Sequence, residues 1–99
     1  MIYLYKEEQG YVAISYDETV KAYIMHVVLH QWSISEYKRY LKIFQVIKEE
    51  LKKLTPYVLS LCHGEKELKF NKVFGFKDTG FIFFSIETGK TYKIARLDL

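Results

Sequence analysis

The chain has 99 residues, of which 49% are hydrophobic and 17% aromatic; this predicts a single domain with a packed core and disfavours intrinsic disorder. The formal net charge of +3 permits an acidic partner but does not require nucleic acid. A lone cysteine, Cys62, excludes an internal disulfide, and no run approaches the roughly 18 apolar residues of a membrane span. The N-terminus lacks the pattern of a signal peptide, so we expect a soluble, cytoplasmic protein.

Three strands are predicted in the first 30 residues. Residues 1–5 alternate weakly in polarity and form a candidate edge strand. Residues 11–16 and 19–30 are rich in β-branched and aromatic side chains, and a short polar turn at Asp17 and Glu18 separates them. We therefore expect the second and third strands to pair as an antiparallel hairpin.

A long amphipathic helix is predicted between Ser33 and Leu54. Apolar residues recur every three or four positions on one helical face: Ile34, Tyr37, Leu41, Phe44, Ile47, Leu51 and Leu54. Ser33 and Glu36 form a capping-box pattern at the start, and Pro56 ends the helix near Leu54. At ~1.5 Å per residue the helix is about 30 Å long, so we expect the rest of the domain to pack along it.

The middle of the chain predicts a buried strand followed by a short helix. Residues 57–63 are a nearly continuous apolar run, which is typical of a strand covered on both faces. Residues 65–74 mix apolar and charged side chains in the pattern of a helix of two to three turns. Gly75 follows this helix at the position where left-handed backbone angles favour glycine.

The last residues predict a closing hairpin. Residues 77–80 indicate a turn, and residues 81–87 and 91–97 indicate strands joined by a hairpin turn that contains Gly89. The order is β-β-β-α-β-α-β-β, with a parallel pair across the long helix, a right-handed crossover and antiparallel hairpins at both ends. We therefore predict one α/β (α+β) domain over residues 1–99, with a mixed sheet of about six strands and two helices.

The segment from Leu68 to Gly80, LKFNKVFGFKDTG, resembles a known family. Together with the order of elements, the part from Asn71 to Phe76 is similar to the C-terminal part of the GNAT acetyltransferase fold, and the resemblance covers about residues 11–99. The chain is also similar to small, diverged GNAT-like proteins of tailed bacteriophages, some of them internal virion proteins. This second similarity implies a location in the host cytoplasm or the virion.

The resemblance also implies where acetyl-CoA and a catalytic residue would stand. The family's acetyl-CoA loop matches Gln31, Trp32, Ser33 and Ser35, and this stretch has no glycine to let backbone amides approach a phosphate closely. The family's general-acid tyrosine matches Asn71, whose amide cannot donate a proton in that role. We therefore predict that acetyl transfer is lost, with no catalytic residue and no cofactor.

The histidines and the cysteine are the remaining candidates for chemistry. His26 and His30 share a strand face but lie ~13 Å apart by strand rise, too far for one metal ion. His30 and His63 end neighbouring parallel strands and could meet there. Cys62 points away from His63, because adjacent strand residues face opposite sides, so a buried structural cysteine is expected. We predict no metal site and no catalytic histidine.

Two surface features suggest partners. Lys38, Arg39 and Lys42, continued by three further lysines, give the long helix a basic face that is either solvated or bound to an acidic partner, including nucleic acid. Seven tyrosines exceed the need of the core and indicate a homodimer or a protein partner: Tyr3, Tyr5, Tyr11, Tyr16, Tyr23, Tyr40 and Tyr92.

Three hypotheses for function follow. The preferred one is a GNAT-like scaffold that has lost acetyl transfer and acts by protein binding, as a phage structural or host-interaction protein. The first alternative is a diverged acetyl-CoA-dependent N-acetyltransferase, with phosphate on the amides of Ser33 and Ser35 and with Glu18 or His26 as the base. The second alternative is a nucleic-acid-binding module that uses the basic helix.

Overall fold

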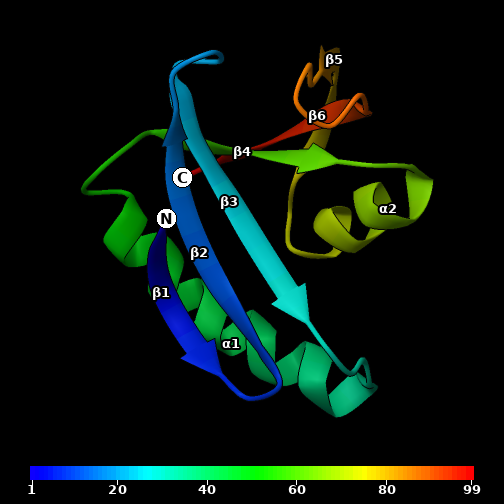
Figure 1. Cartoon of the computed structure of the whole chain (residues 1–99). Helices are drawn as coiled ribbons and strands as arrows, with labels where there is room; N and C mark the ends of the chain where they lie inside the picture. Colours follow the sequence, from blue (N-terminus) through cyan, green and yellow to red (C-terminus); the bar gives the residue numbers. More distant parts are fainter.

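The computed structural model describes all 99 residues as one six-stranded mixed sheet with two helices (Figure 1). The elements in chain order are β1 (Ile2–Glu7), β2 (Gly10–Asp17), β3 (Ala22–Leu29), α1 (Ile34–Leu51), β4 (Tyr57–Cys62), α2 (Glu65–Val73), β5 (Lys77–Phe84) and β6 (Thr91–Asp98). The strands lie in the order β1-β2-β3-β4-β6-β5. All neighbours are antiparallel except β3 and β4, which are parallel. The predicted α+β class and mixed sheet are confirmed.

The sheet opens between β3 and β4. The two strands share a single bridge, between Ile24 and Leu59, and beyond it they run apart (Figure 1). By contrast, β2 and β3 stay paired from Gly10 and Leu29 to the other end of the hairpin. Residues 27–29 therefore have a strand partner on one side only. This opening positions the main groove of the molecule.

Helix α1 begins and packs largely as its sequence indicates. The Ser33 side chain accepts a hydrogen bond from the Glu36 amide at 3.1 Å, which caps the helix. The Glu36 carboxylate does not return to Ser33 but binds Arg39, so only half of the predicted capping box forms. The helix ends at Leu51, and isolated turns continue to Leu54.

The buried face of α1 differs from the predicted stripe. Tyr40, Phe44, Ile47 and Leu51 are buried, whereas Ile34 at the first turn is exposed. The first turn extends beyond the sheet, so the apolar pattern there has nothing to pack against. Tyr40 is buried because its ring lies against β1, where it meets the Tyr5 ring at 6.0 Å.

Both helices cover the same face of the sheet. Phe44 of α1 and Phe74, directly after α2, meet with ring centroids 5.2 Å apart, and they share one apolar core with Met25 of β3 and Val58 of β4. Side chains alternate along a strand, so His26 points to the opposite face. No helix lies on that face. No helix of the structure has the length and apolarity needed to span a membrane.

The prediction for residues 77–80 is wrong. They begin β5, which runs from Lys77 to Phe84, and they form a bulge against β6 rather than a turn. The Asp78 carboxylate accepts from the Gly80 amide, and the Thr79 hydroxyl accepts from the Phe81 amide and donates to the Ile94 carbonyl. These local hydrogen bonds are of the kind found in turns, and here they occur within a strand, where extra residues form a bulge opposite β6.

Candidate functional site

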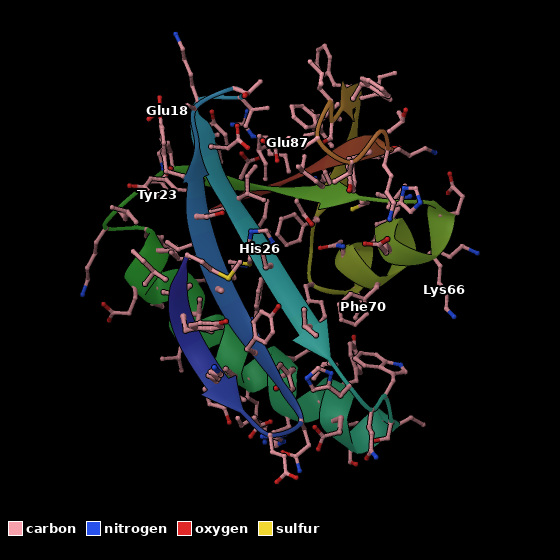
Figure 2. The ribbon with its side chains drawn as sticks, in the orientation of Figure 1. Glu18, Tyr23, His26, Lys66, Phe70 and Glu87 are labelled. Carbon is pink, nitrogen blue, oxygen red and sulfur yellow. The ribbon has the colours of Figure 1, made fainter.

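A groove runs along the opening between β3 and α2. One hollow of about 390 Å³ and one of about 340 Å³ adjoin each other and share Leu29, Lys66 and Phe70. The full lining is Val27, Val28, Leu29, Trp32, Lys66, Glu67, Lys69, Phe70, Asn71 and Val73. We call this feature the splay groove. Figure 2 shows Phe70 on α2 beside the end of β3, with Lys66 farther out on the same helix. Most of the lining is apolar, and its charged side chains are Lys66, Lys69 and Glu67.

Trp32 forms one wall of the splay groove. Its ring lies 5.3 Å from the Phe70 ring and 5.6 Å from the Tyr37 ring, measured between centroids. Of the predicted acetyl-CoA loop, only Trp32 lines the groove. The Ser33 hydroxyl is used by the cap and lies 3.1 Å from the Ser35 hydroxyl, while Gln31 is exposed. A half-exposed indole ring therefore stands at the place where the resemblance implies a phosphate.

The inner end of the groove opens through the sheet. A hollow of about 150 Å³ lies between β3 and β4 and is lined by His26, Ser60, Glu67 and Asn71, among others. The His26 Nε2 atom lies 3.1 Å from the Ser15 hydroxyl. Burial, with a smaller effect from the N-terminal amino group, lowers the pKa of His26 below its usual 6.5. The imidazole is neutral at pH 7 and is able to accept a proton.

The Asn71 side chain, which lines the same hollow, makes two hydrogen bonds within the chain. Its Oδ1 atom accepts from the buried Ser60 hydroxyl at 2.8 Å, and its Nδ2 atom donates to the Glu67 carbonyl at 2.8 Å. The resemblance implies a general-acid tyrosine at this position, but the amide of Asn71 instead links α2 to β4 through its hydrogen bond with Ser60.

The other predicted candidates for chemistry are not brought together. His30 follows the end of β3, and His63 follows the end of β4, where its ring packs on Tyr92 and its Nδ1 atom lies 3.3 Å from the Thr91 carbonyl. The ends of β3 and β4 lie apart (Figure 1), and His63 contacts Tyr92 and Thr91 rather than His30. Cys62 is buried, and burial raises the pKa of its thiol. No three His, Cys, Asp or Glu side chains gather in a metal-binding cluster.

The basic face of α1 is partly neutralised within the chain. Arg39 pairs with both Glu7 and Glu36. Glu7 also accepts from the hydroxyls of Tyr5 at 2.8 Å and Tyr40 at 3.0 Å. The pKa of Glu7 is lowered to about 2, mainly by the hydrogen bond from Arg39 and to a smaller extent by those from the two tyrosines. Lys38 and Lys42 stay exposed without an ion pair.

A second surface was not foreseen from the sequence. Phe81, Ile82, Phe84 and Ile86 lie on or directly after β5 and are 72%, 69%, 60% and 90% exposed. We call these four residues the β5 patch. The sequence predicts a strand with both faces apolar here; β5 is the last strand of the sheet, and the contacts of α2 with it leave these four side chains exposed.

The predicted tyrosine surface is only partly exposed. Tyr3 and Tyr16 are exposed, whereas the other five predicted tyrosines are partly or fully buried. Tyr3 packs edge-on against Tyr11, and Tyr16 packs edge-on against Tyr23, both with centroids 5.2 Å apart. Cross-strand pairing therefore accounts for four of the seven rings, and the phenylalanines of the β5 patch form the larger apolar surface.

No family model, no curated protein and no solved structure matches this chain. The interpretation of function therefore rests on the splay groove and the β5 patch.

Proposed function

We propose that this chain is a GNAT-like domain that has lost acetyl transfer and works by binding protein through the β5 patch. The observation that carries the proposal is the grouping of four large apolar side chains, each at least 60% exposed, at one edge of the sheet. Ile82 and Phe84 share one face of β5, and Phe81 points to the other, so exposed apolar side chains lie on both faces of this edge strand. Isolated exposed apolar residues are ordinary, but several on one edge strand mark a binding surface. A phage structural or host-interaction role is consistent with such a surface.

The GNAT-like part of the proposal is supported by topology. The element order on which the resemblance rests is the order of the structure, and the cleft implied between the strands that precede His30 and His63 is open. The loss of acetyl transfer is supported by Trp32, which packs on Phe70 at the loop position, and by Asn71, whose amide is hydrogen-bonded to Ser60.

A photo-crosslinking experiment tests the protein-binding proposal. Benzoylphenylalanine is placed at Phe84, and separately at Val46 as a matched control, because Val46 is 68% exposed on the outer side of α1 and lies outside the patch. Both variants are irradiated as purified protein and in an extract of the cell of origin. We expect a protein crosslink from position 84 and little from position 46. Equal crosslinking from both positions, or none from position 84, would overturn the proposal.

A second candidate function is binding of an acyl-CoA in the splay groove. A specific observation favours it: the groove is apolar along Leu29 and Phe70, carries Lys66 and Lys69 besides Glu67, and adjoins the separate hollow that His26 lines. An extended acyl-thioester chain with a phosphate at one end matches this order of apolar and basic groups. His26, rather than Glu18, is then the candidate base, because Glu18 lies at the tip of the β2–β3 hairpin, far from Phe70 (Figure 2).

Calorimetric titration with acetyl-CoA and with CoA separates the two functions. Saturable binding that weakens in Lys69→Glu but not in Lys38→Glu would support the acyl-CoA candidate, since Lys38 is exposed on α1 and does not line the groove. Absence of heat at millimolar ligand would remove it.

A further inference from the structure

We infer that the partner of the β5 patch is a second copy of this chain, bound antiparallel across a two-fold axis beside β5. This inference rests on the proposal that the patch binds protein, and it adds the identity and the orientation of the partner. Three observations carry it: the area of the patch, the charges at its two ends, and its position at the edge of the sheet.

The patch is large enough for a weak homodimer. A large aromatic side chain buries about 150–250 Å² when fully covered. A copy beside an edge strand covers the side chains of both faces only in part, so four side chains that are 60–90% exposed offer at most about 500 Å² per copy, or about 1,000 Å² in total. This total lies at the lower limit of specific interfaces. The same area predicts a weak, concentration-dependent dimer rather than an obligate one.

The charges at the ends of the patch are complementary to those of a second, antiparallel copy. Lys77 begins β5, and Glu87 follows its other end; both are exposed, and neither has an ion-pair partner in the chain. A two-fold axis makes each contact occur twice, so Lys77 of one copy faces Glu87 of the other in two places. A parallel arrangement would instead set lysine against lysine.

The edge position leaves room for the second copy, and the bulge decides how it binds. No strand lies beyond β5, and Ile82 and Phe84 on this strand are exposed. The bulge between Asp78 and Ile82 interrupts the regular edge, which limits continuous strand-to-strand pairing. Side-chain packing, rather than backbone hydrogen bonds, therefore provides most of the affinity.

Sedimentation velocity over a wide concentration range tests the inference. We expect the wild-type chain to dimerise with increasing concentration. Ile82→Glu should raise the dissociation constant at least tenfold, because the interface would bury an unpaired carboxylate. The matched control Val46→Glu, which adds the same charge at an equally exposed apolar position, should dimerise like wild type. Circular dichroism establishes that each variant is folded.

Charge reversal tests the antiparallel orientation. Lys77→Glu alone and Glu87→Lys alone should each weaken the homodimer, since like charges then face each other in both places. Mixed in equal amounts, the two variants should form a heterodimer, because both contacts regain opposite charges. A mixture that dimerises no better than its components would overturn the antiparallel arrangement.

The outcome for the partner is separable from the outcome for the proposed function. A purified wild-type chain that stays monomeric at millimolar concentration, combined with a crosslink from position 84 to a different protein in the extract, would overturn the second copy and keep the protein-binding function. A crosslinked product of twice the chain mass from the purified protein would support both. No crosslink from position 84 would overturn both.

Discussion

Substitution of Asn71 by alanine tests whether this position is a structural joint rather than the remnant of a catalytic site. The Ser60 hydroxyl is buried and donates to the Asn71 Oδ1 atom at 2.8 Å, so the substitution removes the acceptor and leaves a buried donor without its partner. A lost hydrogen bond of this kind costs about 1 kcal/mol, and an unsatisfied buried group costs about 1–3 kcal/mol. We expect Asn71→Ala to lower the free energy of unfolding by about 2 kcal/mol.

A double-mutant cycle measured by urea unfolding isolates this hydrogen bond. Ser60→Ala in the Asn71→Ala background should cost little further, because the unsatisfied hydroxyl is gone, which gives a coupling energy of about 1 kcal/mol. Asn71→Asp keeps an acceptor and should retain most of the stability. Lys72→Ala, at the exposed neighbouring position on α2, should change stability by less than about 0.5 kcal/mol. Additive effects of the two alanine substitutions would refute the argument.

Three further predictions concern pH and backbone geometry. The pKa of Glu7 is about 2 in the folded chain and near 4.5 when unpaired, so its contribution to stability is complete above pH 4.5 and is lost as pH falls toward 2. The urea unfolding midpoint of the wild-type chain should therefore fall as the pH is lowered across that window, and the midpoint of Glu7→Gln should fall less steeply. An equally steep fall in the variant would contradict the pairing of Glu7 with Arg39. The His26 imidazole should titrate in NMR below pH 6.5, and a higher midpoint would contradict its burial. Gly75→Ala should destabilise the chain by about 1 kcal/mol or more in urea unfolding, because Gly75 has a φ of +97° and an added Cβ lies 3.3 Å from the Leu97 side chain. No loss of stability would contradict the left-handed geometry.

Several features of the fold are set by the sequence over short distances. Ser33 caps α1, and Gly75 follows α2 with a left-handed backbone, as predicted. Gly89 takes a positive φ in the closing hairpin. These features depend on hydrogen bonds or dihedral angles within a few residues, so the local sequence contains all the information they need.

The tertiary structure decided which apolar residues are buried. Apolar periodicity places Ile34 on the packed face of the long helix, yet Ile34 is exposed, because no other element lies over the first turn of α1. The apolar side chains of the β5 patch are exposed because no strand lies beyond β5. Tyr40 is buried for the converse reason, since β1 lies against it. Burial depends on the neighbour as much as on the residue itself.

Long-range partners were likewise invisible in the chain. Glu7 lies at the end of β1, in a stretch that suggests a polar turn, and Arg39 belongs to a basic helical face; their pairing joins residues 32 positions apart. The opening between β3 and β4, which creates the splay groove, depends on how two half-sheets diverge after one bridge at Ile24. The sequence alone determined the helices and strands and, through their order along the chain, most of the strand pairs. Only the tertiary structure decided where the groove and the β5 patch lie, because the divergence of β3 from β4 opens the groove and the edge position of β5 exposes the patch.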